Sequence, residues 1–302
     1  MIVRAGQTID FTAIAQAISH ATGKAFRVHS QRGIGGGCIN EAMLLEGDGQ
    51  ACFVKLNSVE NGAMFQAEAA GLEAIAAAGC LRTPQVIASG VIGDSSWLAL
   101  EYIALRSPGS TTSSQLGEGL AAMHEVSAPS FGWQQDNHIG ATQQINSWSD
   151  NWVDFFGRQR LDYQLRLAAS RGAPAALGQK GTRLLEQLPR FFDAYQPRPS
   201  LLHGDLWSGN WAADETGSAI IFDPAVYFGD READIAMTEL FGGFDRRFYQ
   251  AYRSTWPLDG GYRTRKNLYN LYHVINHFNL FGGGYGRQAQ DMIDGLLAEL
   301  GP

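Results

Sequence analysis

One stretch of this sequence decides how its fold can be interpreted: LLHGDLWSGN at residues 201–210, followed by IIFDP at residues 220–224. Two short apolar segments enclose a polar loop, and paired strands of this kind can hold such a loop rigidly. The loop presents Asp205 and, five residues later, Asn210, while Asp223 ends the second apolar segment. Each residue alone is an ordinary turn former, so the information lies in their combined spacing.

These polar residues suit phosphoryl transfer. That reaction needs one carboxylate to orient or deprotonate the attacking hydroxyl, and oxygen ligands for the Mg²⁺ ions that offset the phosphate charge. We therefore predict that Asp205 is catalytic and that Asn210 and Asp223 are metal ligands. ATP and Mg²⁺ are the expected cofactors.

The N-terminal half contains a matching nucleotide-binding pattern. Glycines let backbone N–H groups approach phosphates closely, although a glycine run alone could also form a simple hairpin turn. Further along, Lys55 stands among apolar residues, where a cation needs a partner unless it reaches solvent at a strand end. Glu68, on the following Ala-rich segment, is the candidate partner, and Glu73 is the alternative. The candidate phosphate contacts in the glycine run are Gly35, Gly36, Gly37, Cys38 and Ile39.

Hydrophobic periodicity divides the chain into a small β-rich lobe, residues 1–103, and a larger, mostly helical lobe, residues 104–302. The predicted fold class is α+β and bilobal, with ATP bound by the first lobe and catalysis and substrate binding assigned to the second. In the first lobe, the pattern predicts helices at 9–20 and 63–78 and strands at 42–46, 51–56 and 97–103. In the second, it predicts helices at 113–125, 147–170, 178–195, 231–241, 245–255 and 264–281, and a loop at 136–141.

Composition excludes several classes of protein. The chain has 302 residues, of which 45% are hydrophobic and 18% charged, enough to bury one large core or two unequal ones. The net charge of −7, without a Lys/Arg run, argues against a nucleic-acid partner. No apolar run approaches the roughly 20 residues of a membrane span, and no signal-peptide pattern precedes the first helix.

The cysteines suggest a reducing compartment. Cys38, Cys52 and Cys80 are an odd number without metal-ligand spacing, so reduced thiols in the cytoplasm are the simplest interpretation. We expect a monomer without a membrane partner. Because a thiol beside backbone N–H groups can be prone to oxidation, a redox-linked dimer through Cys38 is the alternative.

The order of these features resembles the protein-kinase-like fold: glycine-rich loop, strand Lys, helix Glu, hinge strand, catalytic Asp and metal-binding Asp. Protein kinases have His-Arg-Asp and Asp-Phe-Gly where this chain has 203–205 (HGD) and 223–225 (DPA). An Ala-Pro-Glu motif is also lacking in the sequence. These departures resemble the aminoglycoside and choline kinase branch. The hinge residues that would contact the nucleotide are Glu101, Tyr102 and Ile103.

Four segments resemble the fructosamine (ketosamine-3-) kinase family more closely: GGCIN at 36–40, HGDLWSGN at 203–210, FDPAVYFGDREAD at 222–234 and NHFNLFGGGY at 276–285. The resemblance implies a bilobal fold, ATP and Mg²⁺. It also implies phosphorylation of the sugar 3-hydroxyl of ketoamine adducts, on free amines or on protein lysines. The rival hypotheses are a kinase for choline, an aminoglycoside or a similar alcohol, and a nucleotide-binding pseudokinase that acts as a scaffold.

Several residues allow two interpretations. Trp207 could stack on a sugar or amine, or pack against the lobe. Asp230 could cap a helix or accept a substrate hydroxyl, and the acidic segment around it could attract a cationic nitrogen. Asn276 and His277 could line the substrate pocket or belong to the core. Asp234 is expected to anchor the catalytic loop.

Overall fold

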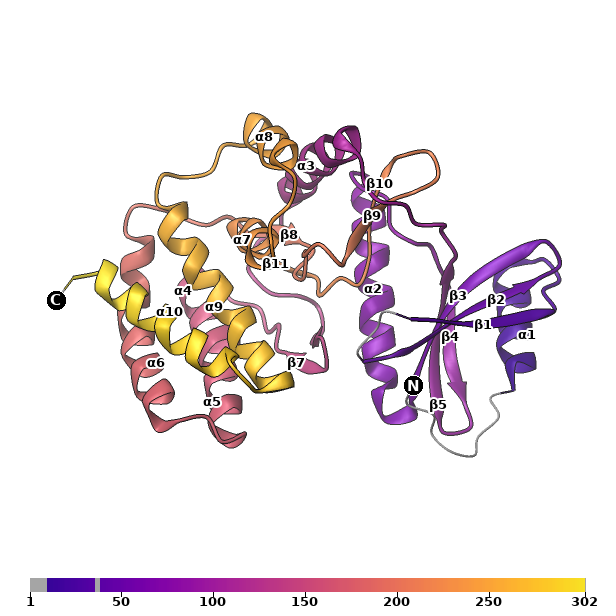
Figure 1. Cartoon of the computed structure of the whole chain (residues 1–302), viewed down its shortest axis with the longest axis horizontal. Coiled ribbons are helices and arrows are strands. Elements are labelled where there is room, and N and C mark those ends of the chain that lie inside the picture. Colours follow the sequence, from indigo (N-terminus) through magenta and orange to yellow (C-terminus); the bar gives the residue numbers. More distant parts are fainter. Residues whose placement is uncertain (1–9, 36–38, 302) are drawn as a thin grey trace. The chain divides into compact units, whose positions relative to one another are not determined.

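The computed structural model describes residues 10–35 and 39–301. The chain folds as two compact units, Met1–Glu73 with Pro84–Ala104, and Ala74–Thr83 with Leu105–Pro302. The first is β-rich and the second mostly helical, so the predicted α+β, bilobal fold class is confirmed (Figure 1). The segment 74–83 belongs to the second unit, whereas the predicted boundary at residue 103 placed it in the first.

A five-stranded antiparallel sheet forms the centre of the first unit, with the strand order β1-β2-β3-β5-β4 (Figure 1). The edge strand β4 was not predicted, because its glycine and half-exposed side chains hide the alternating pattern. The strands are β1 (Ser30–Ile34), β2 (Glu41–Gly47), β3 (Gln50–Ser58), β4 (Val86–Ile92) and β5 (Ser95–Glu101). The helices are α1 (Phe11–Thr22), η1 (Val59–Asn61) and α2 (Gly62–Ala78), whose last residues belong to the second unit.

Side chains from both faces of this sheet are buried. On one face, α1 packs through Ile14 and Ile18 on a cluster that includes Val54, and on the other face α2 packs through Phe65 on Leu98. Successive strand residues point to opposite faces of the sheet, so this arrangement decides which side chains of β3 face α2.

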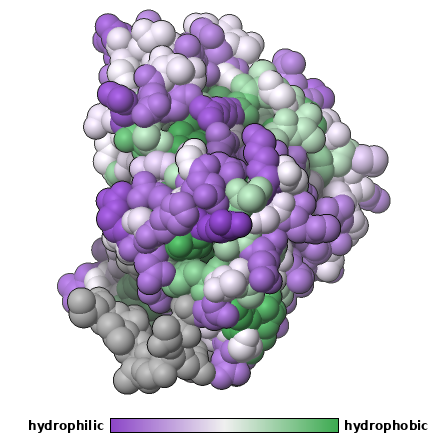
Figure 2. Space-filling view, turned by 90° about the vertical axis from the view of Figure 1, so that its right-hand side faces the viewer, coloured by the Kyte–Doolittle hydropathy of each residue, from purple (hydrophilic) through white to green (hydrophobic). Residues whose placement is uncertain are grey.

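On the side of the molecular surface shown in Figure 2, hydrophilic residues cover most of the area, with smaller hydrophobic areas among them.

Helices surround the core of the second unit. The last helix, α10, was not predicted, because its apolar positions are sparse, although Ala289, Ile293 and Leu296 are buried on one face. No helix within residues 10–35 and 39–301 is long and apolar enough to span a membrane. The helices are α3 (Ser110–Glu125), α4 (Trp152–Phe156), η2 (Gly157–Asp162), α5 (Tyr163–Ser170), α6 (Ala175–Gln187), η3 (Leu188–Phe192), α7 (Glu232–Leu240), α8 (Arg246–Thr255), α9 (Tyr262–Phe281) and α10 (Tyr285–Glu299).

Three short antiparallel strand pairs interrupt the helices of this unit. β6 (Asn137–Ile139) pairs with β7 (Thr142–Gln144), where the sequence predicted a loop. The other two pairs are β8 (Ser200–Leu202) with β11 (Tyr227–Gly229), and β9 (Trp211–Ala213) with β10 (Ala219–Ile221). These two pairs flank the polar segments 203–210 and 222–226.

Candidate active site

Strand pairing places the two polar segments of the second unit side by side. Residues 203–210 connect β8 to β9, and residues 222–226 connect β10 to β11. β8 pairs with β11, and β9 pairs with β10. Each connection therefore begins in one of these strand pairs and ends in the other. The strands themselves are buried, so both polar segments start from fixed ends.

Backbone hydrogen bonds join these segments directly. The N–H of Ala225 donates to the carbonyl of His203 at 2.8 Å, and the N–H of Phe222 donates to that of Asn210 at 3.0 Å. Gly204 makes the first contact possible, because its φ is +81° and a Cβ atom there would lie 2.1 Å from the Ala225 oxygen. The catalytic loop and the Asp223 segment are therefore one connected structure.

Asp234, in the first turn of α7, anchors the catalytic loop as predicted. Its carboxylate accepts the backbone N–H of His203 at 2.7 Å and of Gly204 at 2.8 Å, and lies 3.1 Å from Nε2 of His124. Burial by itself would raise the pKa of Asp234, but the hydrogen bond from His124 and its other contacts outweigh burial and lower it. Asp234 is therefore a buried anion whose carboxylate accepts hydrogen bonds from the backbone of the loop.

His203 also holds the loop and is unsuited to be a base. Its Nδ1 accepts the N–H of Asp205 at 3.3 Å, so Nε2 carries the proton and donates it to the Phe222 carbonyl at 3.1 Å. Burial lowers the pKa of His203, which keeps the ring neutral. Both ring nitrogens are therefore engaged in hydrogen bonds that hold the loop.

Asp205, Asn210 and Asp223 come together at this connection. Asn210 donates from Nδ2 to the backbone oxygen of Asp205 at 2.8 Å and to its carboxylate at 3.3 Å. Burial, assisted by the nearby Asp223 carboxylate, raises the pKa of Asp205 to about 7. A carboxylate with a pKa near neutrality can accept a proton from a hydroxyl and release it again.

Asp223 has an unusual backbone conformation. Its φ is +57°, in the left-handed region that costs a non-glycine residue about 1–3 kcal/mol. Asp48, in the turn between β2 and β3, is the other non-glycine residue with positive φ in the described part of the chain. Strain of this kind persists where the surrounding structure imposes it, and it is concentrated at functional sites.

The donor set fits Mg²⁺. Because Nδ2 of Asn210 faces Asp205, the oxygen Oδ1 is its remaining ligand atom, and the Asp223 carboxylate supplies hard oxygen donors. No group of three or more His, Cys, Asp or Glu side chains forms a metal cage in the described ranges. A nucleotide-bound Mg²⁺ needs only one or two protein ligands, since phosphates and water supply the others.

In the first unit, Lys55 contacts Glu68. Strand alternation in β3 directs Lys55 to the face covered by α2, where its Nζ lies 2.6 Å from Oε1 of Glu68. The two side chains are 8% and 11% exposed, so the pair is nearly desolvated and its geometry is restricted. Glu73, the alternative partner, is exposed.

Replacing Lys55 with Met is expected to lower kcat/KM for ATP roughly 10- to 100-fold, the equivalent of one hydrogen bond to a charged group. KM for the phosphate-accepting substrate should change little. Steady-state kinetics with each substrate varied in turn measure both effects. Glu68→Gln should reproduce part of the loss, and Glu73→Gln serves as the matched control. A silent Glu68→Gln together with a defective Glu73→Gln would contradict the assignment.

The other predicted nucleotide contacts are only partly described. Gly36, Gly37 and Cys38 lie outside the described residues, and with them the predicted redox behaviour of Cys38. Ile39 is 38% exposed, and a Cβ atom on Gly35 would meet open space. The hinge residues Glu101, Tyr102 and Ile103 are half-buried at the end of β5. Contact of all these residues with ATP stays a prediction.

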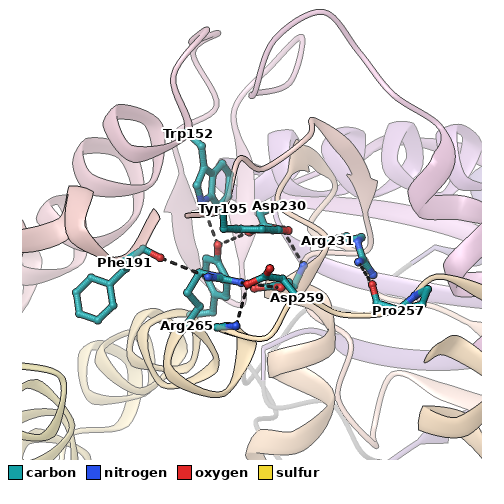
Figure 3. Close-up of polar contacts among 11 residues, drawn as sticks. Trp152, Phe191, Tyr195, Asp230, Arg231, Pro257, Asp259 and Arg265 are labelled. Carbon is teal, nitrogen blue, oxygen red and sulfur yellow. Dashed lines mark hydrogen bonds and ion pairs between the residues drawn. The ribbon is translucent and has the colours of Figure 1, made fainter. Parts of the chain in front are cut away.

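Asp230 and its acidic neighbours are part of the core, which corrects the expectation of a substrate contact. Asp230 is 0% exposed and accepts a hydrogen bond from the hydroxyl of Tyr195 (Figure 3). It also accepts from the hydroxyl of Tyr269 and from the N–H of Glu232. Arg265 forms a buried ion pair with Glu232, with Nε 2.7 Å from the carboxylate. The charge of this acidic segment is offset by Arg265 inside the protein, which argues against attraction of a substrate nitrogen.

Asn276 is likewise buried, which corrects its assignment to the substrate pocket. It is 3% exposed, donates to the carbonyl of Ile139 at 3.3 Å and accepts from Gln164 at 3.2 Å. Both functional ends of its amide are therefore used inside the protein. One position later on α9, His277 lies on a different face of the helix and is only partly buried.

Trp207 and His277 belong to one aromatic cluster, joined by a residue that the sequence did not suggest. The ring of Phe241 lies 6.4 Å from that of Trp207 and 4.8 Å from that of His277. Phe281 and Tyr285 extend the cluster, with ring centroids 5.6 Å and 5.2 Å from His277. Trp207 is 38% exposed and Phe281 57%, so the cluster begins in the catalytic loop and reaches solvent.

Comparison with known proteins agrees with this geometry. Residues 10–299 match the family described as fructosamine kinase. A Synechocystis sp. protein named probable ketoamine kinase is 50% identical, over 94% of this chain and 96% of its own length. The chloroplastic protein-ribulosamine 3-kinase of Arabidopsis thaliana is 42% identical, over 92% of this chain and 86% of its own.

Solved structures show the same relationship. A crystal structure from Haemophilus somnus, assigned as a fructosamine-3-kinase, is 29% identical, with a TM-score of 0.88 over 94% of this chain and 96% of its own. The aminoglycoside phosphotransferase APH(4)-Ia shares the fold at 16% identity, with a TM-score of 0.62 over 95% of this chain and 99% of its own. The resemblance of the four sequence segments is thereby confirmed, and the chain belongs to the fructosamine kinase family.

Proposed function

We propose that this chain is an ATP-dependent ketosamine 3-kinase, which transfers the γ-phosphoryl group of ATP to the 3-hydroxyl of a ketoamine sugar. The observation that carries the proposal is the connected Asp205–Asn210–Asp223 arrangement in a chain of this family. The choice of the 3-hydroxyl rests on the family, because geometry alone cannot select a position on the sugar.

In the proposed reaction, the 3-hydroxyl oxygen forms a bond to the γ-phosphorus while the bond from that phosphorus to the oxygen of the β-phosphate breaks. The proton of the hydroxyl passes to the carboxylate of Asp205, which Asn210 contacts within the same loop. Lys55, held by Glu68, would contact the α- and β-phosphates. Asn210 and Asp223 would hold Mg²⁺, whose charge offsets that of the phosphates.

The aromatic cluster supports a sugar–amine substrate. Trp207 lies two residues after Asp205 in the same loop, and its side chain is 38% exposed. Aromatic faces attract both sugar C–H groups and cationic nitrogens. We propose Trp207 and His277 as substrate contacts, with Phe241 fixing their rings. A monomeric state and a cytoplasmic location remain predictions.

The test is an assay of ATP consumption with ribulosyl-lysine, fructosyl-lysine, choline and an aminoglycoside, followed by NMR of the product. We expect turnover of at least one of the two ketoamines and a phosphate ester on carbon 3 of its sugar. Turnover of choline or the aminoglycoside alone would favour the rival small-molecule kinase. Phosphate on another carbon would contradict the proposed regiochemistry, and binding of ATP without any turnover would favour the pseudokinase.

A further inference from the structure

In the segment that follows Asp223, two buried carbonyl oxygens accept hydrogen bonds from side chains and not from a neighbouring strand. Ala225 and Val226 lie between β10 and β11 and are 2% and 1% exposed. Buried carbonyl oxygens require hydrogen-bond donors. Gln144 donates from Nε2 to the Ala225 oxygen at 3.1 Å, and Asn137 donates from Nδ2 to the Val226 oxygen at 2.7 Å. Both donors come from the β6–β7 hairpin, where Asn137 and Gln144 are direct register partners.

Further hydrogen bonds orient these two amides. The Oδ1 of Asn137 accepts from Gln144 at 2.8 Å and from Asn146 at 2.9 Å. The Oε1 of Gln144 accepts from the hydroxyl of Tyr272, on α9, at 2.8 Å. Because both carbonyl oxygens are occupied by donors, the NH₂ groups must point toward the Asp223 segment. Asn137, Gln144 and Asn146 are 4%, 1% and 1% exposed, so water does not compete for these bonds.

A buried arginine stabilises the far end of this network. Arg160, in η2, is 0% exposed, and its Nη2 donates to Oδ1 of Asn146 at 2.7 Å, while Nη1 donates to the carbonyl of Ile145. Its guanidinium carbon lies 4.2 Å from the ring centre of Tyr227 and 4.7 Å from that of Phe155. The guanidinium is planar and its donors have fixed directions, so it fixes the orientation of the Asn146 amide.

We infer that Asn137 and Gln144 are positioning residues for Asp223, acting through the carbonyls of the two residues that follow Pro224. We call Asn137, Gln144, Asn146, Arg160 and Tyr272 the amide clamp. Asp223 keeps a φ of +57°, a conformation that its surroundings must impose. The catalytic loop holds one side of its segment through the carbonyl of His203, and the amide clamp holds the other. The inference rests on the proposed function in one respect, the role of Asp223 as a ligand of the Mg²⁺–nucleotide complex.

The experiment measures nucleotide binding without turnover. Isothermal titration calorimetry gives the affinity of the full chain for AMP-PNP with and without Mg²⁺, for the wild type and for Gln144→Met, which keeps the side-chain volume but loses the donor. We expect Gln144→Met to weaken Mg²⁺-dependent binding about 10-fold or more, the usual effect of losing a residue that orients a metal ligand. Affinity without Mg²⁺ should be unchanged.

The hairpin offers a matched control. Gln143 is adjacent to Gln144 in β7 but exposed on the opposite face, so Gln143→Met should bind as the wild type does. Tyr272→Phe removes only the hydroxyl that orients Gln144, and should show a smaller loss in the same direction. This second variant tests the inference even if Gln144→Met does not fold.

Two results would overturn the inference while the proposed function stands. One is wild-type Mg²⁺-dependent affinity in Tyr272→Phe and in folded Gln144→Met. The other is an equal loss of affinity with and without Mg²⁺, which would mean that the clamp only supports the fold. A wild-type chain whose affinity for AMP-PNP does not depend on Mg²⁺ would reject the assignment of Asp223 and this inference together.

Discussion

Asp205→Asn is expected to fold and to bind ATP, but to lose at least about 10²-fold in kcat, the scale of general-base and positioning effects. An amide cannot accept the proton of the sugar hydroxyl. The hydrogen bond from Asn210 to the backbone oxygen of Asp205 remains possible in the variant, so the loop should keep its conformation. Steady-state kinetics, with calorimetric titration of AMP-PNP, separate the loss of turnover from any loss of binding.

Asp291→Asn makes the same chemical change at an exposed position on α10 and should have wild-type kinetics. The two variants together distinguish loss of a base from a general effect of lower charge. A near-normal kcat in Asp205→Asn would remove this residue from the catalytic role and require another base in the second unit.

Loss of the Asp223 carboxylate is expected to have the second large effect. Asp223→Ala should abolish Mg²⁺-dependent ATP turnover, and Asn210→Ala should weaken it, because a methyl group cannot replace an oxygen ligand. The expected loss for Asp223→Ala is on the order of 10²-fold or more, the magnitude seen when charge-stabilising groups are removed. A Mg²⁺ titration of the initial rate measures it, and an unchanged metal requirement in both variants would contradict the ligand assignment.

The positive φ of Asp223 complicates an alanine variant, because alanine is strained in this region. Asn adopts positive φ more readily than most residues, so Asp223→Asn separates loss of charge from backbone strain. Asp48, with φ of 50°, provides the control, because Asp48→Ala introduces similar strain within the first unit. Asp48→Ala should lower the melting temperature without altering the Mg²⁺ requirement.

The parts of the candidate site that sequence analysis predicted depend on local geometry. A spacing of five residues between Asp205 and Asn210 lets one loop present both side chains, whatever surrounds it. Strand alternation gives Lys55 a defined face, and a helix after that strand limits its partner to Glu68 or Glu73. The expectation that Asp234 anchors the catalytic loop came from the resemblance to kinase-like folds, and its carboxylate does accept the backbone N–H groups of His203 and Gly204.

The burial of polar residues depended on the tertiary structure. The sequence neighbours of Asp230 and Asn276 are typical of a pocket. In the structure, residues distant in sequence donate hydrogen bonds to them: the hydroxyls of Tyr195 and Tyr269 to Asp230, and the amide of Gln164 to Asn276. Phe241 gave no signal because its contacts with Trp207 and His277 join three separate elements. Long-range packing decides such cases.

By itself, the sequence predicted the fold class from hydrophobic periodicity, a local property of the chain, and the phosphoryl-transfer chemistry from motif spacing and family resemblance. The residues assigned to that chemistry stay predictions. The tertiary structure alone decided how the Asp223 segment is held. The amides of Asn137 and Gln144 donate to the carbonyls of residues 226 and 225, and Arg160 donates to the neighbouring amide of Asn146. The sequence predicted only a loop at residues 136–141, since three-residue strands are too short to show an alternating pattern. Gln144 reaches the carbonyl of Ala225 only in the folded chain, because more than 80 residues separate the two in sequence.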